Sequence, residues 1–281
     1  MIQKLVLPII ITLLLCGCSQ TKKKNITTDS SFILVKGGPI TNQKSQLQGS
    51  GIQLYDFYIA KYEVTQREWK DVMNDNPSAF KGDSLPVENI SWYDCIEYCN
   101  KRSIKEGLSP YYNINKDEKD PVNVSDLDSL KWIITLNTKA NGYRLPAEIE
   151  WEYAAGGGQL SNSYEYSGSD DVDAVAWHWG NSGDAPLNGI WQYNAVAGNN
   201  CRSHPVGMKK PNELGIYDMS GNVREWCVDW YEDESVQIGR YRQVRGGGWL
   251  GVQEACSLNF RMNYRPNNIS TDTGLRLCRN K

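Results

Sequence analysis

Tryptophan and tyrosine supply most of the large side chains that this sequence offers for a core. Ten Trp and sixteen Tyr occur beside only four Phe. Both pack as hydrophobes, but their N–H and O–H groups need hydrogen-bond partners when they are buried. Loops provide many backbone carbonyls that can serve as such partners. With 25 Gly and 11 Pro in the same chain, this composition favours a loop-rich fold with short regular elements.

The N-terminus predicts export and lipidation. A charged start precedes an apolar run from Leu5 to Leu15. This run is shorter than the ~20 residues that a bilayer-spanning helix needs, so a removed signal peptide at residues 1–17 is favoured over an uncleaved anchor. The letters LCGC at 15–18 resemble a lipoprotein cleavage site, which makes Cys18 the lipidated residue. Acyl chains on Cys18 would anchor the protein to a membrane.

Beyond the signal, we expect two parts. Residues 18–30 are polar and patternless, and we interpret them as a solvated tether. Residues 31–281 are long enough for one well-buried domain. The net charge of −3 shows no excess of basic residues, so nucleic acid is not an expected partner. The expected location is the cell envelope, with the anchor in the outer membrane in first place.

Three helices and several strands can be placed from local signals. Thr65 and Glu68 form a capping box that starts one helix, and Ser91 can cap a second. Pro146 is placed as the first residue of a third helix that ends at Ala155, before a run of glycines. The expected strands are Phe32–Lys36, Phe57–Tyr62, Tyr241–Arg245 and Gly274–Arg279.

Two long segments lie between these elements. Residues 107–141 are interpreted as an inserted hairpin or excursion. Residues 156–215 form a long loop region, in which the tryptophans at 177, 179 and 191 favour ordered packing. The chain has two histidines, His178 and His204, and their surroundings favour structural or surface roles over metal binding.

Six segments then carry a family resemblance. In order they read YIAKYEVTQREWKDVM, LPVENISWYDCIEYCNKRS, GYRLPAEIEWEYAAGGG, HPVGMKKPNELGIYDMSGNVREWCVDWY, YRQVRGGGWL and TGLRLCRN. The chain resembles the formylglycine-generating enzyme (sulfatase-modifying factor) family over nearly all of residues 31–281. The resemblance implies an α+β fold of the irregular, C-type-lectin-like kind, with little regular secondary structure.

The family's enzymatic equipment is incomplete in this sequence. Its enzymes oxidise a sulfatase cysteine to formylglycine with oxygen and a copper(I) ion held by two thiolates, the soft ligands that copper(I) prefers. Cys256 matches the second of these cysteines, but Gly251 stands at the position of the first. Gly248 replaces a serine of the site, and Arg224 replaces a tryptophan that lines it. Copper is therefore not expected, and Cys256 is left as a lone candidate catalytic residue.

Two functions follow from this comparison. The favoured one is a non-catalytic binding or scaffold module of the cell envelope, with an envelope protein or a glycan as its partner. The alternative is a divergent formylglycine-generating oxidase in which Cys227 replaces the missing ligand. In that case Cys256 would be an exposed thiol of low pKa.

The resemblance also implies a calcium site and disulfides. A calcium ion would be held by the side chains of Asp218 and Glu225 and the backbone carbonyls of Gly221 and Val223, all hard oxygen ligands. Export permits disulfides. The expected pairs are Cys99–Cys278, by analogy with family members, and Cys227–Cys256, from two segments that flank the family's cleft. Two cysteines have no assigned partner: Cys95 and Cys201.

Overall fold

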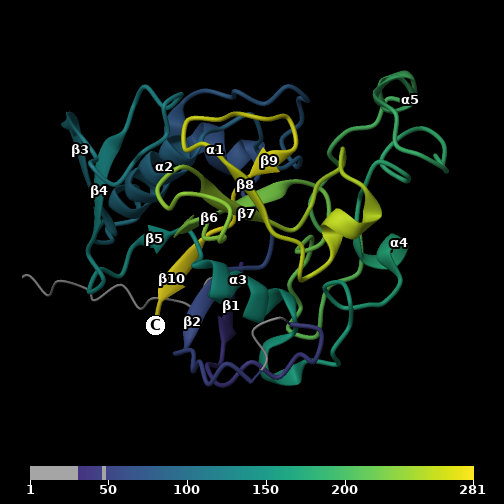
Figure 1. Ribbon diagram of the computed structural model, residues 1–281, viewed down its shortest axis with the longest axis horizontal. Coiled ribbons are helices and arrows are strands. Elements are labelled where there is room, and N and C mark those ends of the chain that lie inside the picture. The colour runs from purple at the N-terminus through teal and green to yellow at the C-terminus, as the bar shows by residue number, and fades with distance from the viewer. Residues whose placement is uncertain (1–30, 46–48) are drawn as a thin grey trace, which may run out of the picture.

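The computed structural model describes residues 31–45 and 49–281 (Figure 1). The expected signal peptide, the tether and Cys18 lie outside the described residues. The fold is a mixed α+β arrangement of short elements joined by long ordered loops, as expected. Within the described part of the chain, no helix has the length and apolar character needed to cross a membrane.

One four-stranded sheet joins the two ends of the described chain. Its order is β1 (Phe32–Val35), β2 (Phe57–Ala60), β10 (Cys278–Asn280) and β5 (Tyr143–Arg144). All neighbours in this sheet are antiparallel. The C-terminal strand therefore lies between strands from the beginning and the middle of the sequence (Figure 1).

A second four-stranded sheet lies at the centre of the molecule. Its order is β8 (Met262–Tyr264), β7 (Arg242–Arg245), β6 (Arg224–Trp230) and β9 (Thr273–Gly274), and only β6 and β9 run parallel. The expected strand Gly274–Arg279 is wrong as a single element. Its ends belong to β9 in this sheet and β10 in the other, and the buried Leu275 and Leu277 lie on the connection between them.

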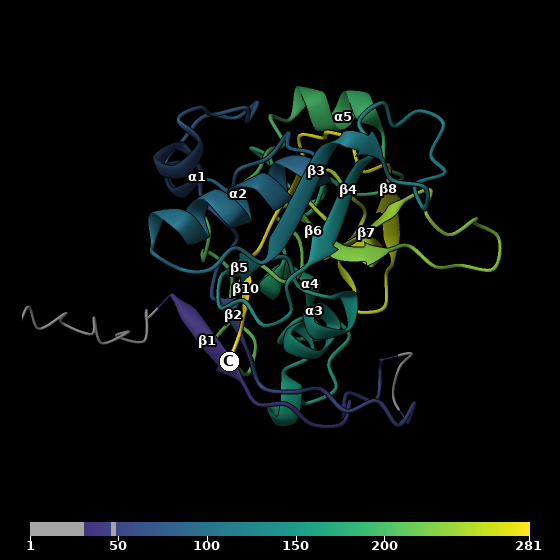
Figure 2. The same ribbon diagram turned by 90° about the vertical axis from the view of Figure 1, so that its left-hand side faces the viewer.

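The inserted segment contains the expected hairpin. Strands β3 (Tyr112–Lys119) and β4 (Trp132–Leu136) pair only with each other and form a separate two-stranded sheet. Figure 2 shows β4 on the side of this hairpin that faces β6 and β7. The long region 156–215 is ordered and contains the short elements η1 (Gly158–Leu160), α4 (Val172–Val175) and α5 (Tyr193–Gly198).

The N-caps predicted for the first two helices are confirmed. Thr65 caps α1 (Gln66–Met73) and Ser91 caps α2 (Trp92–Lys105). The third helix, α3 (Glu148–Ala155), begins two residues later than expected. Its N-cap position is taken by Ala147, whose N–H donates to the Glu150 carboxylate (2.9 Å). The Pro146 carbonyl instead accepts from Val228 N–H of β6 (2.9 Å), so Pro146 precedes the helix and contacts the central sheet.

Buried tryptophans build the core as the composition predicts. Trp92 and Trp226 are each at most 1% exposed. The Trp92 indole N–H donates to the Cys227 carbonyl (3.0 Å), and that of Trp226 donates to the Ile90 carbonyl (3.1 Å). Backbone carbonyls thus satisfy the polar edges of these rings.

Candidate functional site

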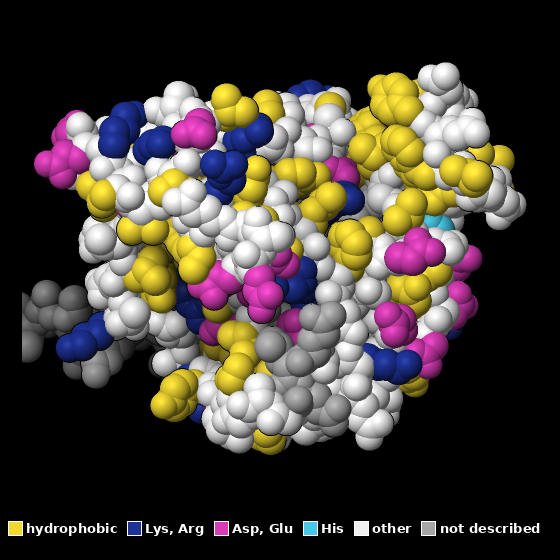
Figure 3. All heavy atoms as spheres, in the orientation of Figure 1, with side chains coloured by type: hydrophobic (Ala, Val, Ile, Leu, Met, Phe, Trp, Pro, Cys, Tyr) yellow, Lys and Arg dark blue, Asp and Glu magenta, His cyan; other side chains and the backbone are white. Residues whose placement is uncertain are grey.

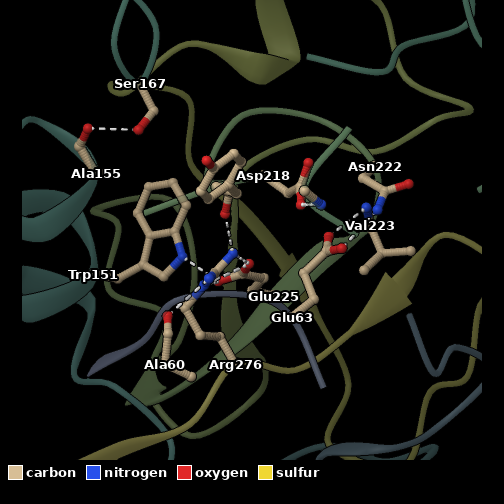
Figure 4. A network of polar contacts seen from close by, with 12 residues as sticks. Ala60, Glu63, Trp151, Ala155, Ser167, Asp218, Asn222, Val223, Glu225 and Arg276 are labelled. Atoms are coloured by element: carbon tan, nitrogen blue, oxygen red, sulfur yellow. Dashed lines mark hydrogen bonds and ion pairs between the residues drawn. The ribbon is translucent and has the colours of Figure 1, made fainter. Parts of the chain in front are cut away.

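A buried ion pair links β6 to the last connection of the chain. Glu225 and Arg276 are both 0% exposed, and Arg276 Nη2 donates to Glu225 Oε1 at 2.7 Å. Figure 4 shows the Trp151 indole pointing at the same carboxylate, with Nε1 2.6 Å from Glu225 Oε2. Arg276 also donates to the carbonyl of Ala60 (2.9 Å). This network holds the central sheet against β2 and α3.

Two further carboxylates lie buried beside this pair. Glu63 accepts from the N–H of Val223 (3.0 Å) and from the side-chain amide of Asn222 (2.6 Å). Burial, together with the carboxylates of Asp218 and Glu225, raises the pKa of Glu63 well above its ordinary range. Burial also raises the pKa of Asp218 to about 6. A protonated Glu63 leaves fewer negative charges for Arg276 to balance in this cluster.

The two side chains expected to hold calcium, Glu225 and Asp218, both contact protein groups in this structure. Both oxygens of Glu225 are already bound by Arg276 and Trp151. Asp218 has one buried oxygen, Oδ1, without a hydrogen-bond partner, while Oδ2 accepts from Gly207 N–H (2.7 Å). Among the described residues, no group of three or more His, Cys, Asp or Glu side chains is placed to hold a metal ion. Glu225 is therefore a partner of Arg276 in this structure, and calcium binding at Asp218, Gly221, Val223 and Glu225 stays a prediction.

The three departures from the family's catalytic pattern meet in space. Arg224 forms a buried ion pair with Asp272. A Cβ added to Gly251 would lie 3.1 Å from Arg224 Nη2, and one added to Gly248 would lie 3.3 Å from Arg224 Nη1. The guanidinium thus borders the positions where the family's enzymes carry a cysteine and a serine. Asp272 was missed by the sequence interpretation, because no local spacing connects it with Arg224.

Cys256 is a buried thiol rather than an exposed nucleophile. It ends η2 (Gln253–Cys256) and is 0% exposed. Burial raises the pKa of Cys256 to about 12, so it is protonated near neutral pH. Gly247, at φ +70°, brings the preceding turn so close that a Cβ would lie 2.6 Å from the Ala255 carbonyl oxygen. One protonated thiol beside a guanidinium does not fit the two-thiolate donor set that copper(I) needs in this family.

Neither expected disulfide, Cys99–Cys278 or Cys227–Cys256, is formed in the structure. The six cysteines of the described residues are buried free thiols. Cys99 packs in the core cluster that contains Cys95, whereas Cys278 packs in a second cluster with Cys227. Cys256 faces the Val252 carbonyl, with Sγ 4.0 Å from its oxygen.

Both histidines have structural roles, as expected. His178 is 1% exposed, and its Nε2 lies 2.9 Å from Asp173 Oδ1. His204 stacks on Trp177 with ring centroids 3.7 Å apart. Burial lowers the pKa of each imidazole, which keeps both rings neutral near pH 7.

An aromatic cleft of about 360 Å³ lies beside the altered catalytic site. The Phe80 and Trp249 rings meet edge to face in its wall, with centroids 5.3 Å apart. Tyr193 lines the cleft and is 66% exposed, and Ile190, three residues earlier in the chain, is 86% exposed. We call these two residues the rim. Figure 3 shows hydrophobic side chains gathered over α5 and the adjoining surface. The tryptophan pattern indicated an ordered region here but did not identify the cleft.

Comparisons with known proteins agree with this geometry. A model of the sulfatase-modifying factor enzyme 1-like domain matches residues 18–281. The chain is 49% identical over 267 residues to the chaperone protein LppX of Paenibacillus barcinonensis, covering 95% of both chains. It is 29% identical over 203 residues to the inactive C-alpha-formylglycine-generating enzyme 2 of Mus musculus, covering 68% of this chain and 48% of that protein.

A solved structure supports the same assignment. Treponema denticola variable protein 1 superposes with a TM-score of 0.71 and 32% sequence identity, covering 89% of this chain and 94% of that one. Family match, relatives and fold therefore point the same way. The chain belongs to the sulfatase-modifying factor (formylglycine-generating enzyme) family.

Proposed function

We propose that this protein is a non-catalytic member of its family that binds unfolded or partly folded exported polypeptides at the cell envelope. The observation that carries the proposal is the aromatic cleft beside Trp249. This cleft adjoins the positions at which the family's catalytic groups are replaced. Next to the cleft, Arg224 is paired with Asp272, and the Cys256 thiol is buried and protonated near neutral pH. The relative LppX is named a chaperone protein, which supports a polypeptide ligand for this chain.

The exposed rim favours a protein over a glycan as the partner. Ile190 and Tyr193 present apolar surface that costs free energy while it faces water. An unfolded chain offers matching apolar side chains. Acyl chains on Cys18 would hold this surface at the membrane where exported chains emerge.

The test compares two activities of the full-length protein. The first is suppression of aggregation when a chemically denatured secreted hydrolase is diluted into buffer. The second is formylglycine formation on a sulfatase-motif peptide with copper and oxygen. We expect slower aggregation and no formylglycine. Formylglycine product would favour the oxidase alternative, and glycan binding without client binding would replace the polypeptide by a glycan.

A matched pair of variants locates the binding surface. Ile190→Ser and Tyr193→Ser remove exposed rim side chains and should weaken client binding without lowering stability. Ile104→Ser removes a side chain that is 64% exposed on α2, and should leave client binding unchanged. Equal effects of rim and control variants would contradict the placement of the binding surface.

A further inference from the structure

One edge of the β3–β4 hairpin is unpaired. Asn137 N–H donates to the Tyr111 carbonyl at 2.7 Å, just beyond the ends of the two strands. Hydrogen-bonded and non-hydrogen-bonded pairs alternate along an antiparallel ladder. In the observed register, Ile134 and Leu136 therefore belong to non-hydrogen-bonded pairs. Their N–H and C=O groups point away from β3.

The two edges of the hairpin are treated differently by the fold. Tyr112, opposite Leu136, directs its own N–H and C=O outward, and both are bonded by the Asn100 side chain (3.1 and 2.7 Å). No described residue hydrogen-bonds to the outward backbone groups of Ile134 or Leu136. The edge of β3 is thus closed at this point by α2, and the edge of β4 is left open.

The open edge borders a cleft of about 810 Å³ between β4 and the end of β6. Four consecutive residues, Ile133–Leu136, line the cleft. Successive side chains of a strand point to opposite faces, so a cleft lined by four in a row meets the strand at its edge. The opposite wall is Val228–Trp230. Trp92 and Arg242 also line the cleft, and the guanidinium carbon of Arg242 lies 3.8 Å from the Trp92 ring centroid.

The charges of the cleft are not balanced internally. Asp120 and Glu232 line it, and neither forms an ion pair with a described residue. Two further carboxylates line the cleft. Glu148 is bound by Arg261 (2.7 Å), and Asp229 accepts from the Glu148 N–H (2.6 Å). With Arg242 and Arg261 as the only cations among its lining residues, the cleft keeps more negative than positive groups. Apolar surface accompanies the two free carboxylates, since Val122 in the lining is 51% exposed. The combination matches a ligand that carries both cationic and apolar side chains.

We propose that this cleft binds an extended, basic polypeptide segment by strand addition to β4. The segment would pair its backbone with the outward groups of Ile134 and Leu136, as in other cases of strand addition to an open sheet edge. Its Lys or Arg side chains would meet Asp120 and Glu232, and its apolar side chains the wall of the cleft. This site is separate from the aromatic cleft beside Trp249 and does not rest on the proposed function.

Peptide chemistry tests strand addition without altering the protein. The probe is a fluorescent seven-residue peptide of alternating Val and Lys, titrated against the full-length protein, with a Val–Glu peptide as its charge-reversed control. Two further Val–Lys peptides are N-methylated at alternate residues, one at odd and one at even positions. Because only one edge of an added strand faces β4, one methylated peptide should lose at least about tenfold in affinity and the other should not. Equal losses, or equal binding of the Val–Glu peptide, would overturn the proposal.

Charge variants test the same site from the protein side. Asp120→Asn with Glu232→Gln should weaken Val–Lys binding about tenfold and flatten its dependence on salt. Asp126→Asn, an 86% exposed carboxylate outside the cleft lining, should change neither. Aggregation of the denatured hydrolase should be suppressed equally by the double variant and the wild type, which separates this site from the proposed client surface. An unchanged affinity in the double variant would overturn the assignment of Asp120 and Glu232.

Discussion

The Arg224 guanidinium lies against the backbone of Gly251, with Nη2 3.1 Å from the point where a Cβ would stand. The ion pair with Asp272 holds the guanidinium in this position. Gly251 and Arg224 are therefore coupled, because the guanidinium occupies space that a side chain at position 251 would need. Restoring a cysteine at 251 alone would not restore a copper site, since the arginine would still occupy its surroundings.

Gly251→Ala should destabilise the wild type by about 1 kcal/mol, because the new methyl group crowds a held side chain. Gly251 does not have a positive φ, so the backbone itself accepts alanine. In an Arg224→Ala background the crowding is gone, and the same change should be neutral or stabilising by up to about 1 kcal/mol. Urea denaturation of the four proteins measures this coupling as a double-mutant cycle. Additive effects would contradict the contact.

Glu225→Gln should lower the free energy of unfolding by about 3–5 kcal/mol, because it leaves the fully buried Arg276 without its counter-charge. The loss should be the same in calcium and in EGTA if Glu225 acts through Arg276. Thermal unfolding of both proteins in both buffers decides the point. A loss that appears only with calcium would make Glu225 an ion ligand, as the sequence motif predicted. Asp56→Asn, which removes a surface carboxylate paired with Lys36 and Lys281, is the control and should have a much smaller effect on stability.

Local sequence signals predicted the helices. Contacts between residues far apart in the sequence could not be predicted in this way. Thr65 and Ser91 cap their helices through contacts within three residues, which a sequence displays directly. The role of Glu225 depends on Arg276, fifty-one residues away, and no spacing rule joins them. The motif around Glu225 predicted an ion ligand, but it gave no sign of the arginine that the fold places against this carboxylate. Likewise, Gly251 and Cys256 showed that the catalytic pattern is incomplete, but only the fold shows that Arg224 borders the gap.

The cysteines should be unreactive in the folded protein and all react after unfolding. Each of the six in the described chain is buried, and burial raises the pKa of Cys256 to about 12. Alkylation of non-reduced exported protein, before and after denaturation, followed by peptide mapping, measures both states. Modification of Cys256 in the native protein would contradict its burial. A linked Cys99–Cys278 peptide would show that the exported protein forms the bond implied by the family resemblance.

Protonation of Asp218 and Glu63 should stabilise the protein as the pH is lowered from 8 towards 5, because these two buried carboxyls bind protons more tightly in the folded state. The two histidines, whose pKa values are lowered by burial, act in the opposite direction. The pKa of Asp218 is raised to about 6, from about 4 in an unfolded chain, and that of Glu63 is raised further above its ordinary value by burial. Between its unfolded and its folded pKa, each of these carboxyls is protonated more fully in the folded state. Its contribution to the free energy of unfolding therefore falls as the pH rises. For Asp218 the change is on the order of 1–3 kcal/mol, and it is complete by about pH 7. Urea denaturation at pH 5, 6, 7 and 8 measures the slope of the free energy of unfolding against pH.

Asp218→Asn should flatten this slope between pH 5 and 7. The amide can still accept the Gly207 hydrogen bond, but it does not titrate. An unchanged slope in this variant would show that Asp218 does not carry the proton.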